Sequence, residues 1–218
     1  MCEMLVWSFD AIAGLPWLEL IKAFAPVVTA FIAYRALQNW KRQDKGKRQA
    51  DFLDQLTDAI NNFVGLMPGP VSTVHLVRIG MASHIPHESK NADPYVAAAI
   101  EYIEKRGATD YKHMADALDA ARPAFVRLQS LAAKGQVFGF DGYIDCQNAI
   151  RKLTWQFGRV QALASFIHSS TWYWQNPEII EHLKKLMEID HEDIAKHLDD
   201  NTVAVHAFLR DAYERIYR

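Results

Sequence analysis

Basic and aromatic residues on two predicted helices are the residue types in this sequence best suited to binding chemistry. Single-stranded nucleic acid is held by cations that contact phosphates and by aromatic rings that stack under bases. The pattern therefore predicts a site for an anionic ligand, with single-stranded nucleic acid as a candidate. The ordinary alternative places Trp155 and Phe157 in the core and leaves the cations solvated. The candidate ligand-binding residues are Arg122, Arg127, Lys134, Arg151, Lys152 and Trp155, and Arg159 follows on the second helix.

Motifs for catalysis or for metal binding are missing from the sequence. It has no GxxxxGKS/T, GxGxxG, CxxC, HExxH or GxSxG pattern. In DHEDIAKHLDD, Asp193 and His197 share a helix face but His191 does not, and acidic residues at the start of that stretch suit a helix N-terminus. We therefore expect no metal site, no cofactor and no catalytic residue, and we expect Cys146 to be a buried thiol.

A ribonuclease alternative rests on two Arg–His spacings. HEPN ribonucleases are helical and carry an Arg followed, after four to six residues, by a His. This chain has such a spacing from Arg78 to His84 and from Arg106 to His113. A chain with 9 His and many Arg produces such spacings by chance. Neither Arg is followed by the polar residue that the family often shows, so we expect a protein that is not an enzyme.

An apolar stretch near the N-terminus, LPWLELIKAFAPVVTAFIAYRAL (15–37), is the strongest local feature. Its uncharged part, 23–34, is shorter than the roughly twenty apolar residues that span a bilayer. The required length is reached only if Glu19 and Lys22 are tolerated, and these residues are three apart and can pair on one helix face. We interpret 15–38 as a transmembrane helix; the alternative is a buried helix of a soluble protein.

Basic residues follow this stretch, and none precedes Lys22. The positive-inside rule then predicts a single span with the N-terminus outside and the remainder in the cytoplasm. No cleaved signal peptide is expected, since its positive n-region is missing. Contact with anionic lipid is the ordinary role of such juxtamembrane cations. They are Lys41, Arg42, Lys45, Lys47 and Arg48.

Small and polar residues recur on one side of the predicted span. Small side chains at every fourth position from Ala25 to Ala33 suit close helix packing. Because a charged stripe facing lipid is costly, several copies can instead pack with that stripe inward, as a pore or a bundle core. The alternative is a monomeric anchor that tilts in the bilayer. The candidate bundle residues are Glu19, Lys22, Pro26, Thr29 and Ala33.

Composition and periodicity together predict an all-α protein. Of 218 residues, 50% are hydrophobic and 23% are charged, which excludes disorder for most of the chain. A net charge of −2 gives no global basicity, and 2 cysteines cannot form a disulfide framework. Apolar residues recur in steps of three and four, without the alternation of strands.

The expected organisation is one membrane helix that continues into a cytoplasmic multi-helix bundle. The expected segments are an extracytoplasmic or interfacial N-terminus (1–14), the transmembrane helix (15–38), a basic continuation of the same long helix (39–67) and a cytoplasmic helical domain (68–218). Further helices are expected at 71–83, 94–106, 109–134, 144–169, 177–189 and from 190 to about 217.

The stretch KAFAPVVTAFIAYRALQNWKRQDKGKRQADFLDQLTDAI resembles the N-termini of bacterial membrane effectors encoded in antiphage defence loci. It looks most like the transmembrane effectors of the Hailong system, over residues 19–60. The resemblance implies a channel-forming homo-oligomer of the bacterial inner membrane. It also implies that single-stranded DNA made by a partner nucleotidyltransferase keeps the channel closed, and that loss of the DNA opens it. No DNA-binding residue carries over, and a passive membrane-anchored scaffold remains the alternative function.

Overall fold

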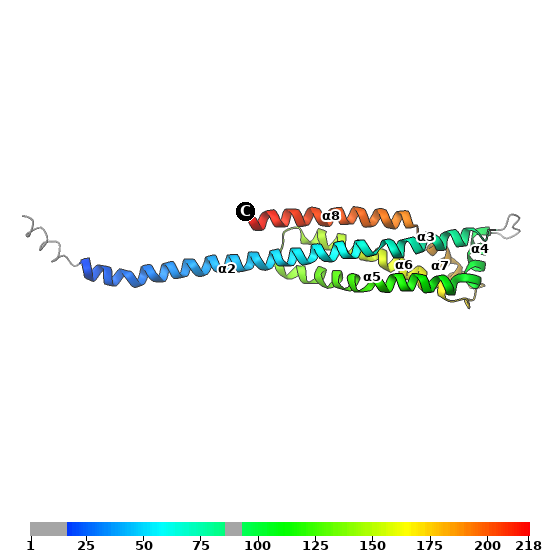
Figure 1. Ribbon diagram of the computed structural model, residues 1–218, viewed down its shortest axis with the longest axis horizontal. Coiled ribbons are helices and arrows are strands. Elements are labelled where there is room, and N and C mark those ends of the chain that lie inside the picture. The colour runs from blue at the N-terminus through cyan, green and yellow to red at the C-terminus, as the bar shows by residue number, and fades with distance from the viewer. Residues whose placement is uncertain (1–16, 86–92) are drawn as a thin grey trace, which may run out of the picture. The chain divides into compact units, whose positions relative to one another are not determined.

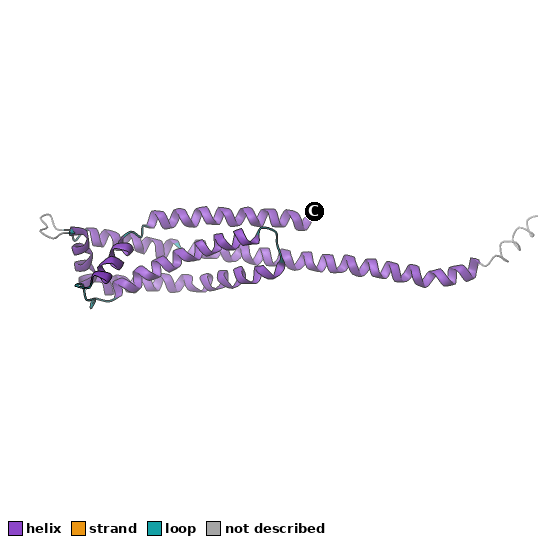
Figure 2. Ribbon diagram, turned by 180° about the vertical axis from the view of Figure 1, so that it is seen from behind, coloured by secondary structure: helices purple, strands orange, loops and turns teal. Residues whose placement is uncertain are grey.

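The computed structural model describes residues 17–85 and 93–218, with side chains from Phe24 onward. Every regular element in these ranges is helical, and no strand occurs in them, which confirms the all-α class for this part of the chain (Figures 1 and 2). The elements are α2 (Trp17–Leu66), α3 (Pro68–Ala82), α4 (Pro94–Tyr102), a π-turn η1 (Ile103–Gly107), α5 (Ala108–Lys134), a 3-10 turn η2 (Gly135–Phe138), α6 (Tyr143–His168), α7 (Pro177–Met187) and α8 (His191–Tyr217).

The described chain divides into two units, the first ending at Arg48 and the second comprising Gln49–Arg218. Helix α2 contributes residues to both. The second unit holds the hydrophobic core, in which α6 packs against α5 and α8, and α3 packs against α5 and α8. Stacked aromatic rings tie α5 to α6, with Phe125 and Phe157 centroids 4.5 Å apart, and Phe63 of α2 lies 6.5 Å from Phe125. The second unit is therefore a helical bundle.

The short helices α4 and α7 lie together where α3 ends (Figure 1). Both begin with a proline that follows a capping side chain. Asp93 accepts a hydrogen bond from the Val96 amide, and Asn176 accepts one from the Glu178 amide. A proline at the first helical position loses nothing, because its missing N–H would have no partner inside the helix. An ion pair between Lys184 and Asp93, 3.0 Å apart, also links α7 to the start of α4.

The junction between α2 and α3 is tighter than the sequence predicts. The expected break over 68–70, followed by a helix from Val71, is wrong, because α3 already begins at Pro68. Met67 keeps helical backbone angles, and the amide of Val71 donates to the Met67 carbonyl at 3.0 Å. The two prolines lie in the first turn, where no amide donor is required, so they start a helix instead of interrupting one.

The predicted end of a helix at Arg106 is also wrong. Helix α4 runs through the π-turn η1 into α5 without a loop. A Cβ atom on Gly107 would overlap the carbonyl oxygen of Ile167, so only glycine allows the backbone of the π-turn to approach the end of α6. Gly107 therefore permits the π-turn to pass close to the end of α6 without interrupting the helical run from α4 to α5.

No helix among the described residues is both long enough and apolar enough to cross a membrane. The expected transmembrane helix over 15–38 is thus without support from the structure. Residues 15 and 16 and the side chains of 17–23, among them Glu19 and Lys22, lie outside the described part. The same holds for the expected N-terminal segment 1–14 and for residues 86–92, which lie between the expected helices 71–83 and 94–106.

Replacing Gly107 by alanine tests the crossing of the π-turn over α6. We expect Gly107→Ala to lower the free energy of unfolding by about 1–3 kcal/mol, as overpacking in a core does. Gly158→Ala is the matched control, since a Cβ there meets nothing within 4 Å and alanine favours the helix. Urea unfolding followed by circular dichroism measures both. Equal stability of the two variants would contradict the proposed role of Gly107.

Candidate ligand-binding site

Helix α6 separates its polar residues from its apolar ones by helical spacing. Its buried face carries Leu153, Phe157 and Val160, and its outer face carries Arg151 and Trp155. The indole of Trp155 is 66% exposed, whereas Phe157 is 1% exposed. The alternative that put both rings in the core is therefore wrong for Trp155. An exposed tryptophan between cations is available for stacking on a planar ligand.

The outer face of α6 borders a hollow of about 620 Å³, on the side where α8 packs. Helix α6 supplies three cations, an aromatic ring and an amide, and α8 supplies an imidazole, a carboxylate and an amide. Asn201 is nearly buried, and its Nδ2 donates to the His197 carbonyl at 2.7 Å, which fixes that part of the wall. The lining residues are Arg151, Lys152, Trp155, Gln156, Arg159, His197, Asp200 and Asn201.

An ion pair joins the two walls of the hollow. Arg159 Nη1 lies 2.6 Å from Asp193 Oδ2 and donates to Gln156 Oε1 at 2.9 Å. The Arg159 guanidinium holds the pKa of the Asp193 carboxyl below its usual value. His197 Nε2 lies 3.4 Å from the other carboxylate oxygen of Asp193. Arg159 is thus neutralised by Asp193, and its main role is to hold α8 against α6.

Arg151 and Lys152 supply the free positive charge of the hollow. Within the residues that the structure describes, neither forms an ion pair, and both are exposed. Asp200 is the carboxylate that faces them across the hollow. The arrangement provides two cations for an anionic group, one ring for a planar group, and polar side chains on α8 for the rim of a ligand.

The structure brings together only part of the predicted ligand-binding set. Arg151, Lys152 and Trp155 line the hollow, whereas Arg122, Arg127 and Lys134 lie exposed on α5 and do not line it. Arg122 pairs with Asp119 on its own helix, with its Nη2 3.0 Å from Oδ1.

The contribution of α8 to the hollow was missed by sequence reasoning. Arg159 of α6, which the sequence analysis names on the same helix as Trp155, follows that ring by one helical turn. No local signal points to His197, Asp200 and Asn201, because the covering of α6 by α8 depends on contacts between distant parts of the chain.

Three of the predicted bundle residues lie in a stretch of α2, from Phe24 to Arg42, that is exposed throughout. Pro26, Thr29 and Ala33 are all exposed, and the Thr29 hydroxyl donates to the Ala25 carbonyl at 2.8 Å. Arg35 lies over the ring of Phe31 at 5.3 Å. The juxtamembrane cations are exposed as well, and they are Lys41, Arg42, Lys45, Lys47 and Arg48.

The remaining chemical candidates are Cys146 and the two Arg–His spacings. Burial raises the pKa of the Cys146 thiol to about 12, so the group stays protonated. In the first of these spacings Arg78 binds Asp190, whereas His84 contacts the Gly80 carbonyl. Arg106 lies 3.7 Å from Asp110. Among residues 17–85 and 93–218, no group of three or more His, Cys, Asp or Glu side chains could hold a metal ion.

The ion pair between Arg159 and Asp193 predicts an acid-sensitive contribution to stability. Because the pKa of Asp193 is lower in the folded state, its contribution is present above the ordinary carboxyl pKa and is lost as pH falls through the folded value. We expect Asp193→Asn to be less stable than the wild type at pH 7, by up to about 1 kcal/mol because the pair is partly exposed, and to match it near pH 2.

Asp199→Asn is the control for this measurement. Asp199 is exposed on the same helix and forms no ion pair in the described part of the chain. Urea unfolding at the two pH values gives the comparison. An equal loss of stability at both pH values in Asp193→Asn would rule out the charged contact as its cause.

Comparison with known proteins found no relative of this chain. No protein-family model matches the chain, and neither a curated protein nor a solved structure matches it significantly.

Proposed function

We propose that the chain is a homo-oligomeric membrane effector whose helical domain binds an anionic ligand in the hollow between α6 and α8. The observation that carries the proposal is the apolar stretch of α2 from Phe24 to Leu37, whose large side chains are exposed over more than half of the helix circumference. Antiphage defence, with a nucleotidyltransferase as partner, is what the N-terminal resemblance implies, and it forms part of the proposal.

An exposed apolar helix surface of this kind is stabilised when lipid or another protein surface buries it. Val28 is 53% exposed and Leu37 is 48% exposed, and their spacing along the helix puts them on opposite sides of it. An apolar helix face of this width is normally buried against other helices or in a bilayer. Each large apolar side chain that leaves water contributes about 1.5–3 kcal/mol, so lipid or neighbouring copies are strongly favoured as the cover.

Assembly of several copies fits the polar residues of this helix better than a lone span does. The helix is not apolar enough to cross by itself, and Glu19 and Lys22 precede its apolar stretch in the sequence. Copies that turn their polar and small sides toward one another leave only apolar sides for lipid. The exposed cations from Lys41 to Arg48 then meet the anionic headgroups.

The ligand side of the proposal rests on the hollow. Single-stranded nucleic acid offers phosphates to Arg151 and Lys152 and a base to Trp155. Such a ligand gates a membrane oligomer only if it binds the closed and open states with different affinity. Opening of the oligomer on loss of the ligand then dissipates the membrane potential.

A charge in the apolar stretch tests the membrane part. We expect Val28→Lys to move the full-length protein from the membrane fraction to the soluble fraction and to abolish its detergent-extracted oligomer. Val203→Lys is the matched control, because Val203 is a 69% exposed valine on α8. A wild-type protein that is monomeric and soluble without detergent would overturn this part. Membrane binding without any effect on the membrane potential would favour the passive scaffold.

A charge reversal in the hollow tests the ligand part. We expect Arg151→Glu to weaken binding of a fluorescent oligothymidylate at least tenfold, about 1.4 kcal/mol, in an anisotropy titration. Trp155→Ala should weaken it by a similar factor because a stacked base is lost. Arg127→Glu changes the same charge on α5, outside the hollow, and should bind as the wild type does. Equal weakening by Arg151→Glu and Arg127→Glu would indicate diffuse electrostatic attraction and would contradict the site.

A further inference from the structure

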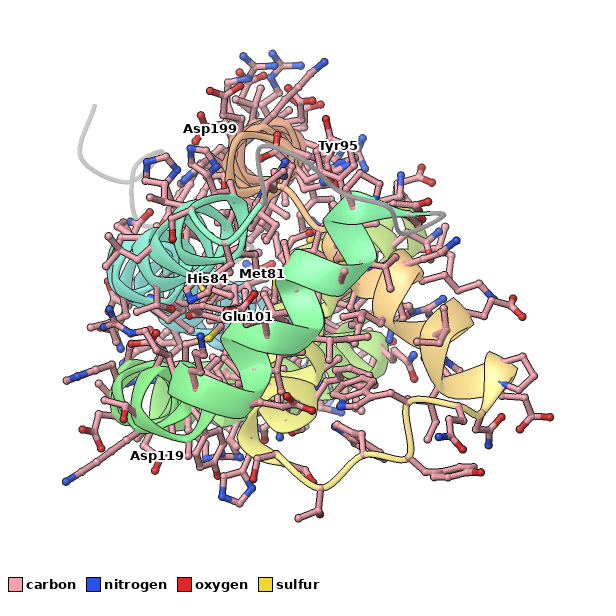
Figure 3. The ribbon with its side chains drawn as sticks, turned by 90° about the vertical axis from the view of Figure 1, so that its right-hand side faces the viewer. Met81, His84, Tyr95, Glu101, Asp119 and Asp199 are labelled. Carbon is pink, nitrogen blue, oxygen red and sulfur yellow. The ribbon has the colours of Figure 1, made fainter. Side chains whose placement is uncertain are left out.

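A second, smaller cavity lies at the end of the bundle where α3, α4, α6 and α7 meet. Figure 3 looks onto this end and labels Met81 of α3 and Tyr95 of α4, which both line the cavity. Its volume is about 190 Å³. The lining residues that matter for its chemistry are Val77, Arg78, Met81, Tyr95, Leu163 and Met187. None of them lines the hollow between α6 and α8.

The walls of this cavity are mainly hydrocarbon and thioether. Val77, Met81 and Leu163 are almost fully buried, whereas Tyr95 is exposed. Methionine side chains are flexible and polarizable, so Met81 and Met187 can adapt to ligands of slightly different shape. The cavity has room for about six water molecules, and these walls offer water few hydrogen bonds. An apolar group that displaces such water is favoured.

Arg78 is the cation of the cavity wall. Its Nη1 donates to the Ile189 carbonyl at 3.3 Å and to Asp190 Oδ1 at 2.7 Å. A guanidinium has five N–H donors, and in the described part of the chain no partner is recorded for those on Nη2 and Nε. The bonds to Ile189 and Asp190 therefore hold the guanidinium in position while donors remain for a further acceptor. A carboxylate is the group whose geometry matches such a pair of donors.

We infer that this cavity binds a small amphipathic carboxylate, with its chain of about six carbons among the apolar walls and its carboxylate on Arg78. A nucleotide is too large and too polar for this space. A neutral alcohol of the same length fills the walls but forms no charge-assisted hydrogen bond with Arg78. The inference is independent of the proposed membrane function, because it uses neither the α2 stretch nor the hollow.

Methionine methyl groups give a direct readout of this cavity. The full-length protein, labelled with ¹³C at its methionine methyls, is titrated with hexanoate and, separately, with hexanol. We expect hexanoate to shift the signals of Met81 and Met187 saturably and to leave Met114, which lies in the core at α5, unchanged. Hexanol should bind at least tenfold more weakly than hexanoate.

Three variants separate the cation from the shape of the cavity. Arg78→Gln should weaken hexanoate at least tenfold and leave hexanol unaffected. Asp190→Asn is the control, because it removes the carboxylate charge that competes for Arg78, while the amide oxygen can still accept the hydrogen bond that positions the guanidinium. Asparagine is also a good capping residue at the start of α8, so this variant should bind hexanoate as tightly as the wild type or more tightly. Ala82→Leu should fill the cavity, of which Ala82 is a wall, and abolish binding of both ligands.

Each outcome of these titrations either supports or overturns the carboxylate site. Loss of hexanoate binding in Arg78→Gln together with retention in Asp190→Asn supports the site. Equal affinity for hexanoate and hexanol, or unchanged hexanoate affinity in Arg78→Gln, overturns the assignment of a carboxylate. Failure of hexanoate to shift Met81 and Met187 in the wild type overturns the site itself.

Discussion

Burial of one face of α6 between α5 and α8 is the constraint on which the rest of this structure depends. Leu153, Phe157 and Val160 leave water together, because their helical spacing puts them on one side. The same spacing turns Arg151 and Trp155 outward, away from the core. A packing requirement thus produces a cationic, aromatic surface, and α8 converts that surface into a hollow by adding a second wall. The ion pair between Arg159 and Asp193 links α6 to α8.

The end of the bundle depends on a different requirement, close approach of backbones. Helix α4 reaches α5 through a π-turn, and Gly107 allows that turn to touch the end of α6. Pi-turns are uncommon and often accompany functional sites. Here the short helices α4 and α7 lie across the bundle end and cannot fill it completely. The small cavity beside Arg78 results from this imperfect closure, and its methionines keep it adaptable.

The apolar stretch of α2 is not buried by the rest of the described chain. Its large side chains are exposed, whereas most apolar residues of α2 beyond Ala50, such as Phe52 and Phe63, are buried in the bundle. One helix therefore carries two kinds of apolar surface. One is buried by its own chain, and the other is exposed. The change from one to the other coincides with the basic segment that ends at Arg48. This contrast is the reason to look for lipid or further copies as the missing cover.

The sequence by itself determined the helical class, the apolar face of α6 and the sites of most helix ends, because these follow from periodicity and capping within a few residues. It did not reveal that the prolines after Met67 start a helix or that Gly107 lies inside one, since neighbouring backbone decides both. Only the tertiary structure placed α8 over α6. Arg159 and Asp193 are 34 residues apart, and Arg78 and Asp190 are 112 apart. Helical spacing shows that a face is apolar, but many apolar faces are alike, so only packing of the whole bundle selects the helix that covers it.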